Sequence, residues 1–242
     1  MNIQEIVSLT QEIQSTRQLS TLNLLYSRYK DYDSPHIAYV LGVRFLILGD
    51  KNLAKNCLIS GARYGLKYPT PYYETPFIDS IGQCYAYLVT QFSTNQLIAS
   101  KATALAYLYL SKAISLTRGR AFDSYRTRAI LFKDNESPIA IQNLIADNYN
   151  LMAMEEPFIL SDYFNSANVP GSPHSECMND ARRIHRNLDD ISIGGKDANL
   201  YSLEELAIVG ESRHQRMFES VEEKFKNGSL NMTLLDLNNL NP

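Results

Sequence analysis

Small residues recur at helical spacing within one apolar stretch, and this feature limits the possible folds most. The stretch 38–62 reads AYVLGVRFLILGDKNLAKNCLISGA and places Ala38, Gly42, Ala54 and Gly61 inside helical patterns instead of turns. A small residue on one helix lets a neighbouring helix approach, and a large residue one turn away fills the groove beside it. The stretch therefore predicts helices that pack very close together.

Helical periodicity extends over most of the 242 residues. Apolar residues recur mostly at i, i+3, i+4 and i+7, and strict alternation over the length of a strand is scarce. Hydrophobic residues make up 45% of the chain and charged residues 20%, so it can bury a core as one large domain or two small ones. The pattern predicts an all-α protein with helices at 2–17, 19–31, 35–48, 51–67, 74–93, 98–118, 122–133, 137–153, 157–166, 173–189 and 202–227.

Several segment ends carry recognisable signals. Ser34 before Pro35 is typical of an N-cap with proline at the first helical position. Ser202 and Glu205 have the spacing of a capping box. The segment SANVPGSP at 166–173 clusters turn-forming residues and is typical of a hinge, and ISIGGKDAN further on is typical of a loop. We therefore expect a helical domain at 1–165 and a C-terminal helical extension at 173–242.

Two copies of a spaced motif occur along the chain. LGVRF at 41–45 and IGQCY at 81–85 each place an aliphatic residue, a glycine, two variable residues and an aromatic residue in order. Each copy is followed by a second half-motif, which consists of a small, an aliphatic and a small residue. The spacing between these three residues is the same in both copies. The members of this half-motif are Ala54, Leu58 and Gly61 in the first copy and Ala106, Leu110 and Ala113 in the second. A weaker echo, LNLLYSRY, lies at 22–29.

This pattern resembles the tetratricopeptide repeat, whose helix pairs carry Leu-Gly-x-x-Tyr and Ala-x-x-x-Phe-x-x-Ala. The resemblance implies an α-α superhelix of antiparallel helix pairs, continued by degenerate flanking pairs, and a concave surface that binds a peptide or a helix of another protein. An irregular all-helical bundle is the alternative. In the resemblance, the side chains that face the groove are Tyr39, Val43, Asp79, Gln83 and Tyr87.

Two groups of arginines are candidates for contacting the same kind of partner. The formal net charge of -3 provides no large basic field for a nucleic acid or an anionic membrane. We therefore expect the arginines to lie on solvated faces or to meet acidic groups of a protein. The first group holds Arg118, Arg120, Arg126 and Arg128, and the second holds Arg182, Arg183 and Arg186.

The C-terminal half contains residue types that bind metals or act in catalysis. HSEC at 174–177 offers only one closely spaced ligand pair, whereas a structural zinc site wants four ligands. Glu211 and His214 have the i, i+3 spacing of di-iron bundles, but those bundles use the motif twice, so a solvated helix face is the expected role here. Cys57 and Cys84 stand among apolar residues and are expected to pack as small core side chains.

These patterns favour a non-catalytic module for protein–protein interaction, without a metal or a cofactor. The three cysteines are odd in number and widely spaced, the start of the chain lacks a signal-peptide pattern, and no apolar run is long enough to span a bilayer, so a cytoplasmic location is expected. The resemblance implies an adaptor, a chaperone, or an immunity or regulatory partner. The alternative is an enzyme or effector with a nucleic-acid or metal-dependent site built from His174, Cys177, His185, Glu211 and His214.

Overall fold

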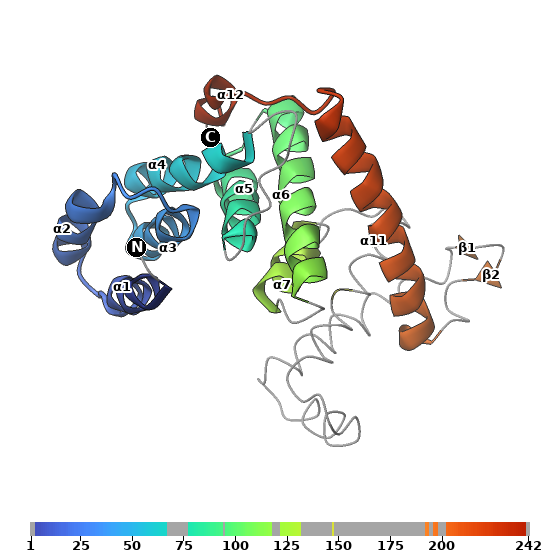
Figure 1. The fold of residues 1–242 in the computed structure, drawn as a ribbon, viewed down its shortest axis with the longest axis horizontal. Helices are drawn as coiled ribbons and strands as arrows, with labels where there is room; N and C mark the ends of the chain where they lie inside the picture. The colour runs from blue at the N-terminus through green and yellow to red at the C-terminus, as the bar shows by residue number, and fades with distance from the viewer. Residues whose placement is uncertain are drawn as a thin grey trace, which may run out of the picture. The chain divides into compact units, whose positions relative to one another are not determined.

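A computed structural model gives the arrangement of most of the chain (Figure 1). The residues that it describes are 3–66, 77–93, 95–117, 122–131, 147, 192–193, 196–197 and 202–240. The predicted helices at 137–153, 157–166 and 173–189 and the predicted hinge at 166–173 lie outside these residues, apart from Asp147.

The described part of the chain is helical, which confirms the predicted fold class in its coarse form. The two short strands pair antiparallel within the segment that the sequence presented as a loop. Within the described residues the predicted helix boundaries agree with those found to within four residues, except that the helix predicted at 51–67 ends at Ala62 and is continued by a 3-10 helix. The elements are α1 (Ile3–Ser15), α2 (Leu19–Tyr29), α3 (Pro35–Ile47), α4 (Lys51–Ala62), the 3-10 helix η1 (Arg63–Leu66), α5 (Ile78–Phe92), α6 (Gln96–Leu116), α7 (Phe122–Leu131), β1 (Ser192–Ile193), β2 (Lys196–Asp197), α11 (Leu203–Lys226) and α12 (Leu234–Asn238).

The chain forms two compact units whose boundary differs from the division expected at 166–173. Unit 1 comprises Met1–Tyr109 and Val221–Pro242, and unit 2 comprises Leu110–Ser220. The end of the chain thus belongs to the same unit as its beginning, because the last residues pack on the N-terminal helices.

The helices of unit 1 pack in sequential antiparallel pairs, and α3, α4 and α5 are in mutual contact (Figure 1). Local chemistry fixes where these helices begin. The Ser34 hydroxyl accepts a hydrogen bond from the Ile37 amide at 3.4 Å, with Pro35 in the first turn, so the predicted N-cap is confirmed. Asp50 caps α4 in the same way, and Gly49 before it adopts a positive φ of 90°.

Close approach of helices explains the glycines in unit 1. A Cβ atom added to Gly42 would lie 2.8 Å from Leu58 Cγ on α4, and one added to Gly61 would overlap the Cys84 sulfur on α5. Gly82 is buried as well. The prediction that small residues let these helices pack closely is therefore confirmed at Gly42 and Gly61.

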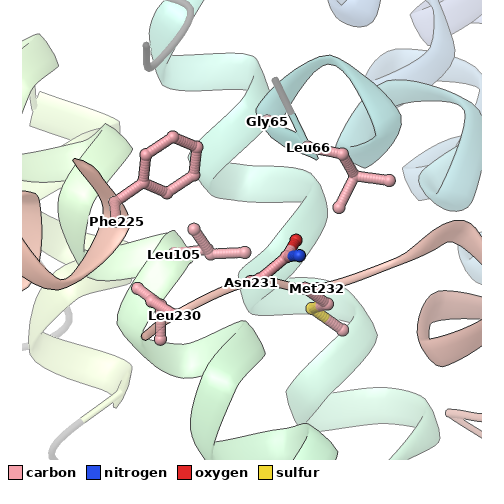
Figure 2. Close-up of a pocket in the computed structure, with 7 residues that line it drawn as sticks. All are labelled: Gly65, Leu66, Leu105, Phe225, Leu230, Asn231 and Met232. Carbon is pink, nitrogen blue, oxygen red and sulfur yellow. The ribbon is translucent and has the colours of Figure 1, made fainter. Parts of the chain in front are cut away.

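The C-terminal segment closes one side of unit 1. Phe225, Leu230 and Met232 are buried, and Figure 2 shows their side chains converging with those of Leu66 and Leu105. The space between them is too small for a water molecule. The segment is also tethered through its backbone, since Lys101 Nζ donates to the Asn231 carbonyl at 3.1 Å and Lys55 Nζ donates to the Asn238 carbonyl at 3.0 Å.

In unit 2 the described residues come mainly from α7, the end of α6 and most of α11. The Ser202 amide donates to Glu205 Oε2 at 2.7 Å and the Glu205 amide donates to Ser202 Oγ at 3.1 Å, so the predicted capping box is confirmed. Ser124, Ala129 and His214 are buried. These helices therefore share a core of their own that includes polar side chains.

Candidate functional site

A pocket of about 300 Å³ opens between α2, α3 and α4 of unit 1. Tyr26 and Tyr29 stand on one face of α2, and Tyr32 follows in the loop to α3. The opposite walls carry small side chains at Ala38 and Ser60, which leave room for the hollow. We call this hollow the tyrosine pocket, and its lining comprises Tyr26, Tyr29, Lys30, Asp31, Tyr32, Ala38, Leu41, Asn56, Cys57 and Ser60.

The rings of the tyrosine pocket are held in place by contacts with one another and with the core. The Tyr29 and Tyr32 ring centroids lie 6.0 Å apart. The Tyr26 ring meets the buried Phe45 ring edge to face at 5.6 Å. Such aromatic pairs contribute about 0.5–1.5 kcal/mol beyond burial, so the rings are positioned before any ligand arrives.

The polar groups of the tyrosine pocket are uncommitted within the described part of the chain. The hydroxyls of Tyr26, Tyr29 and Tyr32 make no hydrogen bond there, and neither do the side chains of Asn56 and Ser60. The Lys30 ammonium and the Asp31 carboxylate form no ion pair with those residues either. A hollow with this many free donors and acceptors can bind a polar ligand without breaking internal bonds.

The cysteine of the tyrosine pocket is buried and its thiol is held in the protonated form. Cys57 is 4% exposed, and burial together with the Asp50 charge raises the pKa of its thiol to about 12. Burial raises the pKa of the Cys84 thiol as well. Because the thiolate is the reactive form, both cysteines behave as the core side chains that the sequence predicted.

The predicted groove residues divide into two groups. The Tyr39 and Tyr87 rings meet with centroids 6.0 Å apart, and both side chains are half-buried, as are Val43 and Asp79. Gln83 is 1% exposed, so the expectation that its side chain faces an open groove is wrong. The reason is that α5 is covered on nearly all sides, and its buried residues include neighbours of Gln83 such as Gly82 and Cys84.

The predicted arginine group divides as well. Arg126 on α7 is exposed, but Arg128 is 2% exposed and cannot contact a partner, so this expectation is wrong for Arg128. The remaining predicted arginines lie outside the described residues: Arg118, Arg120, Arg182, Arg183 and Arg186.

Arg128 is the centre of a buried polar cluster in unit 2. Its Nε donates to both Asp147 carboxylate oxygens, at 3.1 and 3.0 Å, and its Nη2 lies 2.5 Å from Oδ1. Its Nη1 donates to Ser111 Oγ at 3.1 Å, and its Nη2 lies 3.4 Å from Glu211 Oε1. We call this set the arginine cluster, and it comprises Ser111, Tyr125, Arg128, Asp147, Glu211 and His214.

The arginine cluster corrects the expected role of Glu211 and His214. His214 is 2% exposed and its Nε2 lies 3.3 Å from Asp147 Oδ1, so the pair does not form a solvated helix face. Potential metal-ligand atoms of Asp147, Glu211 and His214 do lie within 4.8 Å of one another. However, Arg128 already occupies both Asp147 oxygens and compensates their charge, so the arrangement fits a buried ion-pair network better than a metal centre.

Electrostatics in the arginine cluster favour an ionised Asp147. Burial alone raises the pKa of this carboxyl, but the charges and hydrogen bonds of Arg128 and His214 outweigh burial and hold the pKa below its usual range. A carboxylate that is ionised and fully bonded inside the protein is a structural element. Of the other residues in the alternative site, His174, Cys177 and His185 lie outside the described part of the chain.

A serine and a histidine also meet in unit 1. His36 Nδ1 lies 3.0 Å from Ser80 Oγ, and His36 Nε2 lies 3.1 Å from Thr10 Oγ1. The Thr10 hydroxyl donates to the Ile6 carbonyl, so its oxygen can accept from His36 Nε2, and the Ser80 hydroxyl has a second acceptor in Asp79 Oδ1 at 3.3 Å. Ser80 is fully buried, so no substrate can reach it. The contact therefore ties α1, α3 and α5 together.

No protein-family model, curated protein or solved structure matches the chain. Among the described helices, none combines the length and the apolar character needed to cross a membrane. The functional conclusion therefore rests on the side chains of this chain, and the tyrosine pocket is a site in its described part with several groups available to a ligand.

Proposed function

We propose that the protein is a non-catalytic binding module that docks a segment of another protein in the tyrosine pocket. The observation that carries the proposal is the set of three tyrosine hydroxyls, an amide and a hydroxyl that line one hollow without partners among the described residues. Tyrosine is enriched at protein interfaces because it offers a large rigid ring with a polar tip. The pocket therefore has the residue chemistry of a recognition site, although its tyrosines differ from those predicted.

The tetratricopeptide-like arrangement is part of the same proposal. Its support is the antiparallel pairing of the helices in unit 1 and the burial of both motif glycines, Gly42 and Gly82. A stack of this kind presents a rigid surface, and rigidity lowers the entropy lost on binding. The half-buried pair of Tyr39 and Tyr87 extends the aromatic surface on α3 and α5.

Site-specific photo-crosslinking in the native source tests the docking site. A photo-reactive amino acid replaces Asn56, which is exposed and lines the pocket, or Tyr32, which is 40% exposed at its rim. We expect one protein to be captured from both positions. The matched control replaces Lys51, which is exposed on the same helix, lies outside the pocket lining and should capture nothing comparable.

A second variant links the captured protein to the tyrosines. Replacing Tyr26 and Tyr29 by alanine in the Asn56 photo-reactive protein should abolish the capture. Equal capture from positions 51 and 56, or capture that survives the double replacement, would show that the pocket is not the docking site.

A further inference from the structure

The charge and the rings of the tyrosine pocket indicate which side chain it accepts. We infer that the occupant is a basic side chain, arginine or lysine, carried by the docked protein segment. This inference rests on the proposed function, because it names the chemistry of the segment that the module binds.

The aromatic rings supply the first part of the argument. A guanidinium or an ammonium is attracted to the face of a tyrosine ring within about 6 Å of its centroid. The chain itself makes this contact at Tyr29, where the Arg28 guanidinium lies 5.8 Å from the ring centroid. The rings left for an incoming cation are those of Tyr26 and Tyr32 in the same lining. An acidic side chain would meet the negative faces of these rings and be repelled.

The acidic groups supply the second part. Asp31 lines the pocket without an ion-pair partner in the described part of the chain. Its negative charge acts on the wall of the pocket, because after burial it is one of the causes that raise the pKa of Tyr26. Lys30 lies at the exposed rim on a long flexible stem, so it can turn to solvent when a cation enters.

The hydrogen-bond acceptors supply the third part. A guanidinium carries five N–H donors and no acceptor. The Asp31 carboxylate after α2 offers acceptors on one side of the pocket, and the Asn56 amide oxygen and the Ser60 hydroxyl on α4 offer acceptors on another. The volume of about 300 Å³ is at the small end for ligand sites, which suits one long side chain better than a larger ligand.

Nuclear magnetic resonance titration of the full chain with blocked peptides tests this inference. The probes are acetyl-Gly-Arg-Gly-amide, its lysine counterpart and, as the matched control, acetyl-Gly-Glu-Gly-amide. We expect both basic peptides to shift the amide signals of Tyr26, Asn56 and Ser60, and the acidic peptide to leave them in place. The Asp31→Asn variant, which keeps the shape and removes the charge, should bind the arginine peptide about fivefold more weakly.

The matched variant Glu12→Gln removes an exposed acidic charge from α1, away from the pocket lining, and should bind like the wild type. An acidic peptide that binds as well as the basic ones, or equal affinities for Asp31→Asn and wild type, would overturn the basic occupant. If crosslinking at position 56 still captured a protein in that case, the binding module would stand and only the choice of occupant would be wrong. Loss of both results would overturn both proposals.

Discussion

The tyrosine pocket and the arginine cluster use similar polar side chains in opposite states. In the arginine cluster, Arg128 and Asp147 are at most 2% exposed and bond to each other. In the tyrosine pocket, hydroxyl, amide and charged groups line a hollow and have no partners in the described residues. Buried polar groups must be bonded internally, whereas unbonded ones persist where water or a ligand can reach them. The comparison indicates a structural role for the cluster, and it is consistent with the recognition role proposed for the pocket.

The largest expected effect is the loss of Arg128. The Arg128→Met variant leaves the Asp147 carboxylate buried without its main partner, which costs about 3–5 kcal/mol of folding free energy. Urea unfolding followed by circular dichroism measures this loss. The matched control is Arg126→Met, an exposed arginine on the same helix, whose effect should stay within about 0.5 kcal/mol. Equal stabilities of the two variants would contradict the structural role of the cluster.

A double variant sharpens the same point. Replacing Arg128 by methionine and Asp147 by leucine removes both charges together, and buried ion pairs replaced by apolar residues are often neutral in stability. We expect the double variant to recover part of the folding free energy that Arg128→Met loses. The recovery should be incomplete because His214 and Glu211 lose their charged partners. A double variant less stable than Arg128→Met would show that the carboxylate is not the group left unsatisfied.

An intermediate effect is expected where helices of unit 1 touch. Gly61→Ala forces a methyl group onto the Cys84 sulfur, and overpacking of this kind costs about 1–3 kcal/mol. Adding Cys84→Ala removes the sulfur and should restore part of the lost free energy, since the next contact is the Pro35 carbonyl oxygen at 3.3 Å. Thermal unfolding of the two single variants and the double variant measures the coupling. Strictly additive losses would show that the two residues do not share this contact.

A smaller effect concerns pH and the His36 contact. Burial lowers the pKa of the His36 imidazole, and Asp79 only partly opposes it. The unfolded chain then binds the proton more readily than the folded chain. The contribution of His36 to the free energy of unfolding is therefore fully present above the ordinary histidine pKa of about 6.5 and is lost as the pH falls below it. We expect the stability of the His36→Gln variant to fall less steeply between about pH 7 and pH 5. Parallel pH curves for the two proteins would argue against this role.

The sequence predicted the parts of the fold that depend on local pattern. Gly42 and Gly61 indicate where two helices approach closely, because only a residue without a side chain fits there. Ser34 and Ser202 indicate where helices begin, because each stands at the spacing of a helix cap. Gln83 and Arg128 were misplaced because one helix can be covered on every side, and a polar residue on it is then buried with its own partners. Periodicity alone does not reveal which faces of a helix its neighbours cover.

The sequence allowed only some residues of the tyrosine pocket and the arginine cluster to be predicted. The spacing of Glu211 and His214 is visible in the sequence, but Asp147 and Arg128 reach them from distant positions along the chain. Tyr26 and Tyr29 stand in the echo LNLLYSRY, yet the hollow beside them exists because Ala38 on α3 and Ser60 on α4 are small. Such combinations depend on how helices register against one another, which no short motif encodes.

Removal of the three pocket hydroxyls is the most direct test of the contrast between the two sites. The Tyr26→Phe, Tyr29→Phe, Tyr32→Phe triple variant keeps the rings and deletes only the groups said to be uncommitted. We predict a free energy of unfolding within about 0.5 kcal/mol of the wild type, as for surface changes that break no internal bond. If the hydroxyls were bonded inside the protein, the variant would lose about 1 kcal/mol for each of them, and that result would contradict the account.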